Sequence, residues 1–180
     1  MGQADTLVAF GGVYSDYEAA KADYEAVRDV YESTDLIETY DAAVIRKKDN
    51  GKVKIADKHE QPMHKGAWHG AGWGLAAGLG LALFPAAAIG GGLLAATAGG
   101  GAALGAIAGH ASAGMSRSDL KELGERLDAG EAGLIVVAAA DVEDQVAAAM
   151  TRADDVITKN LQLDEEALDE DVSEAEAEAS

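Results

Sequence analysis

The stretch Gly133-Leu134-Ile135-Val136-Val137-Ala138-Ala139-Ala140 has no polar side chain. An apolar run of this length is typical of a buried strand, and the lack of a polar face predicts a central place in a sheet. A second short run, from Thr6 to Phe10, is followed by Gly11-Gly12. We therefore expect another buried strand, which ends at these two glycines.

Helical spacing follows the first strand. Ser15 and Glu18 form the S-x-x-E pattern of a capping box, which supplies partners for the free amides at a helix start. Behind it, apolar residues recur at spacings of three and four, which predicts a helix to about Ser33 with one buried face. We expect the tyrosines of this face to pack in the core rather than to bind a ligand. The residues of the face are Tyr17, Ala20, Tyr24, Val27 and Tyr31.

The rest of the chain, apart from its centre, continues to alternate strands and helices. Asp49-Asn50-Gly51 supplies the positive φ angles of a tight turn, so its flanks are expected to form a hairpin. Ser116 or Ser118 can begin a helix that Gly130 ends. The other predicted elements are strands at Ala42–Arg46 and around Val53 and Ile55, a helix carrying Leu120, Leu123 and Leu127, a helix from Val142 to about Arg152 capped by Asp141, and a short last strand at Val156-Ile157.

The order of these elements predicts an α+β fold. Once the centre of the chain is removed, a βαββαβ core remains with a further αβ unit, which is ferredoxin-like. Folds of this kind carry many unrelated functions, so the prediction assigns no activity. We expect residues 1–62 and 116–162 to form the two halves of this domain, with an insertion at 63–115 and an acidic tail at 163–180.

The charge of the chain is uneven. The formal net charge is −18, and nine acids with no base follow Lys159. Because like charges repel and the tail has little apolar surface to bury, we expect it to be disordered or a frayed helix. The tail is available to a basic partner. The overall acidity argues against nucleic acid as a main partner, because that binding depends on Lys and Arg.

The centre of the chain is free of charge and rich in glycine. No Asp, Glu, Lys or Arg occurs between Lys65 and Arg117, and fifteen of the 22 glycines lie there. Small residues recur every four positions in two arms, and Phe84-Pro85 between the arms suits a turn. In helices, such positions form ridges where two backbones can approach closely. The ridge glycines are Gly66, Gly70, Gly74 and Gly78 in the first arm and Gly101, Gly105 and Gly109 in the second.

This predicted helical hairpin, a glycine zipper, fits two settings. The first arm, residues 66–84, is about 28 Å long as a helix, close to the roughly 30 Å of a hydrocarbon core, and the second, residues 86–113, is longer. Basic residues on both flanks favour a membrane hairpin whose ends lie in the cytoplasm. Lys65, Trp68 and Arg117 are the expected interfacial anchors. The alternative is a soluble assembly that buries the hairpins of several copies in its core.

The sequence has few residue patterns that support catalysis, cofactor binding or metal binding. It has no cysteine, which excludes thiol nucleophiles and thiolate metal sites. No lysine follows the glycines as a P-loop requires. His59, His64 and His69 recur every five residues, whereas metal ligands on one helix face need a spacing of three or four. We therefore expect no catalytic residue, cofactor or metal, and an enzyme or ligand sensor with a pocket between sheet and helices has the least support.

Four stretches carry a family resemblance: Thr6–Ser33, Asp49-Asn50-Gly51-Lys52-Val53, the glycine-rich insertion, and Asp119–Gly124 continuing through Gly130–Val137. In pattern and order they resemble the domain-of-unknown-function family 1269, bacterial proteins with a glycine-rich hairpin that are often labelled membrane or stress proteins. The resemblance covers nearly the whole chain except the tail. It implies an envelope or stress role but no established activity or cofactor, so no functional residue carries over.

These observations lead to one expected function and one alternative. We expect a non-enzymatic, homo-oligomerising protein whose glycine-zipper hairpin lies in or on the cytoplasmic membrane, in contact with lipid. Its globular part would lie in the cytoplasm. The alternative is a soluble self-assembling scaffold, a particle or filament, with the hairpins packed at its centre.

Overall fold

A computed structural model describes most of the α+β part of the chain and a portion of its centre and tail. Within the described residues, six strands form one sheet in the order β4-β3-β2-β5-β1-β6. Neighbouring strands are antiparallel, except that β4 runs parallel to β3. The described residues are 5–33, 40–48, 53–59, 75–84, 88–89, 109–139, 143–164, 166–167, 170–171, 173–174 and 177.

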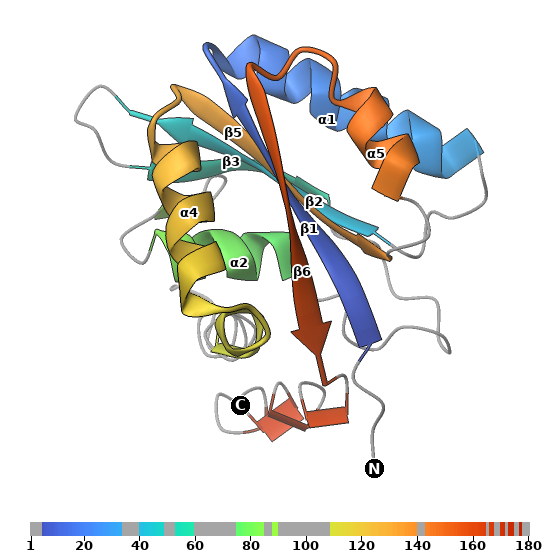
Figure 1. Cartoon of the computed structure of the whole chain (residues 1–180), viewed down its shortest axis with the longest axis vertical. Coiled ribbons are helices and arrows are strands. Elements are labelled where there is room, and N and C mark those ends of the chain that lie inside the picture. Colours follow the sequence, from blue (N-terminus) through green and yellow to red (C-terminus); the bar gives the residue numbers. More distant parts are fainter. Residues whose placement is uncertain are drawn as a thin grey trace.

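The elements alternate along the chain and form layers on the two sides of the sheet (Figure 1). Residues 109–113 and the described residues of the tail between 166 and 177 also have helical backbone. The strands are β1 (Asp5–Tyr14), β2 (Tyr40–Lys47), β3 (Val53–His59), β4 (Ala88–Ile89), β5 (Ala132–Ala139) and β6 (Asp155–Leu163). The helices are α1 (Tyr17–Ser33), α2 (Leu75–Leu83), α4 (Arg117–Asp128) and α5 (Glu143–Ala149).

Strand β5 occupies the centre of the sheet, as its continuous apolar run predicts. It lies between β2 and β1, and its residues from Ala132 to Ala138 are buried. Ile135 and Val137 belong to the core on one face, whereas Leu134 and Val136 belong to the core on the other. A strand that packs on both faces cannot carry a polar side, which explains its composition.

The two faces of the sheet are covered by different helices. Helices α1 and α5 contribute Ala20, Val27 and Val146 to one core, and α2 and α4 contribute Leu79 and Leu123 to the other. Figure 1 shows the first pair on one side of the strands and the second pair on the other. The apolar face predicted for α1 is confirmed, because its members are buried or packed against the first core.

Strand β1 does not end at Gly11-Gly12, as expected, but continues to Tyr14. Glycine is required at both positions because side chains of α4 and of the residue after α5 approach the strand closely. A Cβ on Gly11 would lie 2.4 Å from Cδ1 of Leu123, and one on Gly12 would lie 2.5 Å from Cε of Met150. Glycine here is a packing residue rather than a strand terminator.

The predicted capping box of α1 is wrong in its capping residue. Asp16 Oδ1 accepts the backbone N–H of Ala19 at 2.8 Å, so Asp16 caps the helix. The Ser15 hydroxyl instead donates to the carboxylate of Asp154, which precedes β6. At α4, Ser116 rather than Ser118 is the N-cap, and its hydroxyl accepts the N–H of Asp119 at 3.1 Å.

The ends of other elements differ from the predictions. Strands β2 and β3 form the expected antiparallel pair, with a register shift between Val44 and Ile45, and their turn lies outside the described residues. Helix α5 ends at Ala149 rather than near Arg152. Strand β6 is nine residues long, not a short strand, because it pairs with β1 from Asp155 to Leu163.

The glycine-rich centre contributes directly to the fold. Ala76 and Leu79 of α2 are buried in the core that α4 also covers. The predicted second arm, a helix running from residue 86, is wrong at its start, because Ala88 and Ile89 pair with β3 as the short strand β4. An open strand edge offers these two residues partners that a helix starting just after Pro85 does not. Among the helices of the described residues, none is long and apolar enough to cross a membrane.

Candidate functional site

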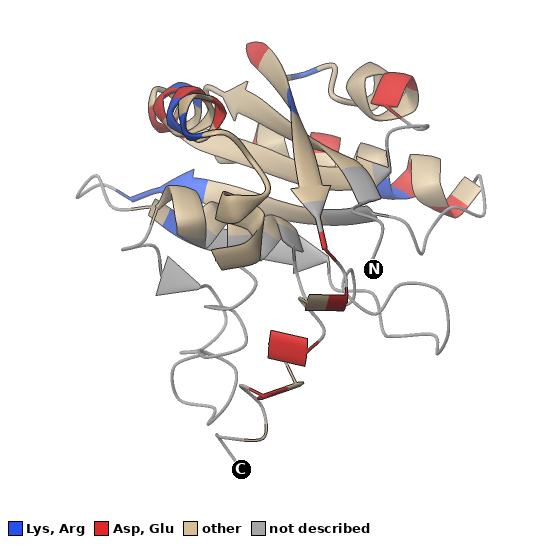
Figure 2. Cartoon of the chain, turned by 60° about the horizontal axis from the view of Figure 1, so that its bottom comes forward, with Lys and Arg blue, Asp and Glu red and all other residues tan. Residues whose placement is uncertain are grey.

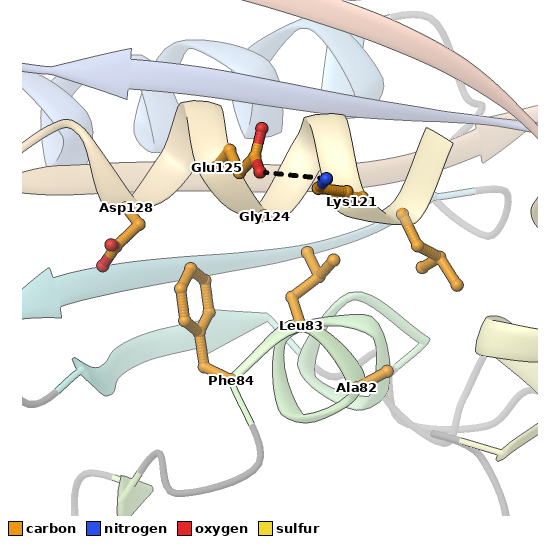
Figure 3. Close-up of a pocket in the computed structure, with 8 residues that line it drawn as sticks. Ala82, Leu83, Phe84, Lys121, Gly124, Glu125 and Asp128 are labelled. Atoms are coloured by element: carbon orange, nitrogen blue, oxygen red, sulfur yellow. Dashed lines mark ion pairs between the residues drawn. The ribbon is translucent and has the colours of Figure 1, made fainter. Parts of the chain in front are cut away.

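An open groove of about 510 Å³ lies between α2 and α4 (Figure 3). The end of α2 and the residue after it form one wall, and the outer face of α4 forms the other. Its floor is apolar and its rim is charged. The lining residues are Ala82, Leu83, Phe84, Leu120, Lys121, Gly124, Glu125 and Asp128.

Small and apolar residues create the groove. Leu83, Phe84 and Leu120 are half-buried and pack against the core beneath them. Figure 3 shows Leu83 pointing toward α4 at Gly124. A Cβ on Gly124 would meet Cδ2 of Leu83 at 3.7 Å, an ordinary contact, so this glycine leaves α4 flat where α2 approaches it.

The charged residues of the rim are already paired. Lys121 Nζ lies 3.8 Å from Glu125 Oε1, one helical turn away on α4. Asp128 Oδ1 lies 3.5 Å from Lys47 Nζ of β2. Exposed pairs of this kind contribute little to stability. The groove therefore offers an apolar floor with local charges balanced, which suits the packing of apolar side chains.

A second set of charges connects α4 to the outer strand β6. Lys159 Nζ lies 2.7 Å from Glu122 Oε2 and 3.1 Å from Asp119 Oδ1. The hydrogen bond to Glu122, followed by that to Asp119, raises the pKa of Lys159. The hydrogen bond from Lys159, followed by that from Ser116, lowers the pKa of Asp119. Arg126, near the end of α4, forms a further ion pair with Asp155 of β6. Charged residues in both halves of α4 are therefore paired with residues of β6.

A buried polar cluster, which the sequence patterns did not indicate, lies on the opposite face of the sheet. Asp23 of α1 is 0% exposed. Its carboxylate accepts hydrogen bonds from the Tyr14 hydroxyl at 3.0 Å, from the Arg152 backbone N–H at 2.9 Å and from Arg152 Nη1 at 3.1 Å. Burial, and then the Asp23 charge, raises the pKa of Tyr14. The sequence does hold one usable signal, since Asp23 lies within the apolar stripe between Ala20 and Val27.

The cluster ties distant parts of the fold together. The carboxylate has three donors, so its burial is compensated. Through these bonds α1, β1 and the segment that leads into β6 are tied at one point, although they are far apart in sequence. The raised pKa keeps the Tyr14 phenol protonated, which is the state that donates to Asp23.

The residues that the sequence singled out are only partly described. Gly78 lies within α2, and Gly109 is exposed on the helical residues 109–113, with nothing within 4 Å of where a Cβ would lie. Arg117 begins α4 and is exposed. The structure brings none of these three together. The others lie outside the described residues: Gly66, Gly70, Gly74, Gly101, Gly105, Lys65 and Trp68.

His110 makes a contact that was not expected. Its Nε2 lies 2.6 Å from Oδ2 of Asp171, a residue of the acidic tail. The tail therefore touches the helical residues 109–113, and this contact brings together two segments whose sequences predict separate regions.

Comparison with known families gives one match. A family model described as "Protein of unknown function (DUF1269)" matches residues 67–173, more than half of the chain. No curated protein and no solved structure matches the chain significantly. The matched region contains α2, α4, β5, α5 and β6, and thus both walls of the groove.

Proposed function

The chain belongs to the DUF1269 family, as its sequence pattern predicted, and from this premise we propose that it is a non-enzymatic protein that associates with itself through its glycine-rich segment. In this proposal the segment lies in or on the cytoplasmic membrane, and the α+β part lies on the cytoplasmic side. The acidic tail, which contacts His110 through Asp171, carries the charge that a basic partner would recognise. The segment's small residues let helices from different copies pack backbone to backbone.

The observation that carries the proposal is the anchoring of α2. One side of this helix, with Ala76 and Leu79, is buried on the sheet. The residues at its end, Leu83 and Phe84, line an open apolar groove. A charge-free segment is thus attached to a folded domain by a short helix whose last residues line an open groove. Self-association would cover apolar surface that one copy leaves exposed.

We also propose a ferredoxin-like arrangement for the α+β part. The strands of β1-α1-β2 have β5 between them, and the strands of β5-α5-β6 have β1 between them. Two interleaved units of this kind are the split βαβ pattern. In this interpretation β3, β4, α2 and α4 are additions between the two halves. Only α2 and β4 fall within the insertion expected at residues 63–115, whereas β3 and α4 were expected to belong to the two halves.

A soluble self-assembling scaffold remains the second candidate. The burial of Ala76 and Leu79 favours it, because these residues of the glycine-rich segment pack on the sheet instead of meeting lipid. Both candidates require self-association. They differ in whether lipid or protein covers the rest of the segment.

Fractionation followed by mass measurement tests the proposal. The full chain is expected in the membrane fraction after a carbonate wash and, in detergent, at a mass of several copies. Complete release without detergent would contradict membrane attachment and favour the scaffold.

A double variant, Gly70→Leu with Gly74→Leu, should lower the oligomer mass, because leucine keeps the backbones apart. Ala71→Leu, one position off the ridge, is the matched control and should leave the mass unchanged.

A further inference from the structure

The outer strand of the sheet, β6, has an open edge. The backbone N–H of Gln162 donates to the carbonyl of Gly114 at 2.8 Å, on the side away from β1. Because the backbone groups of an antiparallel strand alternate in direction, Val156, Thr158 and Asn160 present theirs on the same side as Gln162. In the part of the chain that the structure describes, no hydrogen bond reaches these three residues on that side.

We propose that this edge pairs with the same edge of a second copy of the chain, antiparallel and centred on Thr158, so that the two sheets become continuous. The inference rests on the proposed self-association, but it places a contact outside the glycine-rich segment. A two-fold pair centred there sets Thr158 opposite itself and Val156 opposite Asn160. All the open backbone groups of the edge then gain partners, because the open segment is symmetric about Thr158.

Strand β6 lacks the usual protection of an edge. Strands that must stay unpaired carry a proline, a bulge or a free lysine. β6 has no proline, and its register with β1 is unbroken from Asp155 to Leu163. Its one lysine, Lys159, is held by Glu122 and Asp119 of α4 and does not project from the edge. The side chains of Thr158 and Asn160 are exposed.

The charges beside the edge are paired within one copy, so they oppose a second copy much less than the charge of the whole chain suggests. Beside β6, the carboxylates of Asp119 and Glu122 share Lys159, and the carboxylate of Asp155 is paired with Arg126. Figure 2 shows acidic and basic residues side by side on α4. In the proposed register Lys159 lies opposite Ile157 of the other copy, so no like charges within the strand face one another.

The antiparallel direction also separates the acidic tails. Each tail begins directly after Leu163. With Thr158 at the centre, the two Leu163 residues lie ten positions apart, or about 34 Å along the strands. This exceeds the screening length of about 8 Å at physiological ionic strength, so the tails barely repel one another. A parallel pair would bring them side by side.

Disulfide trapping in the full chain tests the pairing, because the natural sequence has no cysteine. In Thr158→Cys the two introduced thiols face each other across the two-fold axis, with Cα atoms about 5.5 Å apart. That is within the roughly 4.4–6.8 Å span of a disulfide. Asn160→Cys is the matched control, since it is exposed on the same strand but about 14 Å along the strands from its own copy.

Under mild oxidation, Thr158→Cys should yield a covalent dimer of twice the monomer mass on a non-reducing gel, and Asn160→Cys should not. An oligomeric wild type without the Thr158→Cys dimer, or with equal cross-linking of both variants, overturns the edge pairing alone. A monomeric wild type without any cross-link overturns the proposed function as well. A Thr158→Cys dimer whose yield survives Gly70→Leu with Gly74→Leu supports an edge contact independent of the glycine ridge.

Discussion

Tyr14 donates a hydrogen bond from its hydroxyl to the fully buried carboxylate of Asp23, with 3.0 Å between the two oxygens. The residues belong to β1 and α1, and Arg152 completes the cluster from the segment before β6. A carboxylate buried in this way is stable only while its donors are present. The cluster therefore makes the packing of α1 depend on residues at the far end of the chain.

Removing the carboxylate should destabilise the fold strongly. In Asp23→Ala the buried Tyr14 hydroxyl and the Arg152 backbone N–H lose their acceptor, and a buried donor left unpaired costs about 1–3 kcal/mol. Chemical denaturation followed by circular dichroism measures the free energy of unfolding. Asp29→Ala is the control, because Asp29 is exposed on the same helix. Equal losses in the two variants would contradict the role of the cluster.

The Tyr14 phenol should make stability depend on alkaline pH. Its pKa is raised by burial from 10.0, the value expected in the unfolded chain. Above about pH 10 the unfolded chain releases this proton and the folded chain keeps it, so the free energy of unfolding falls by up to about 1.4 kcal/mol per pH unit. Below about pH 10 the Tyr14 phenol is protonated in both states, so the stability that it contributes is present in full. Tyr14→Phe should lack it, and the difference between the two curves isolates Tyr14 from the other tyrosines.

The ion pairs between β6 and α4 should be visible in an NMR titration of Asp119. Its pKa is lowered chiefly by the hydrogen bond from Lys159, so Lys159→Met should move the pKa back up toward 3.8. In the wild type, the stability that this carboxylate contributes is present above pH 3.8 and is lost as the pH falls through its lowered pKa. Lys121→Met, which removes the Glu125 partner instead, should leave the Asp119 pKa in place. An unchanged pKa in Lys159→Met would show that the cation is not its cause.

Substitution by alanine should have opposite effects on stability at two glycines of the segment that leads into α4. A Cβ on Gly114 would lie 1.9 Å from the carbonyl oxygen of Gln162, so Gly114→Ala must push the segment away from β6. Overpacking of this kind costs about 1–3 kcal/mol. Gly109 is helical with open space around a Cβ, and alanine there should stabilise by up to about 1 kcal/mol. Thermal unfolding compares both with the wild type, and a stable Gly114→Ala would contradict the close approach.

Local patterns in the sequence were sufficient for the elements that depend on near neighbours. The apolar run Gly133–Ala140 predicted the central strand, the three- and four-residue spacing behind Ser15 predicted the buried face of α1, and Asp49-Asn50-Gly51 predicted the β2–β3 hairpin. The family resemblance is likewise a property of the sequence, and the match over residues 67–173 confirms it. Each of these depends on side chains a few positions apart, which a linear pattern contains.

Only the tertiary structure decided features that depend on distant atoms. β1 continues through Gly11-Gly12 because it pairs there with β5 and β6, and the glycines leave the space that Leu123 and Met150 need. Asp23 is buried because Tyr14 and Arg152 supply its hydrogen bonds. β6 extends to Leu163 because β1 offers a full-length partner, and among the described residues it is the last strand at its side of the sheet. In each case folding brings the partner residue close, and the spacing of residues along the chain does not predict that contact.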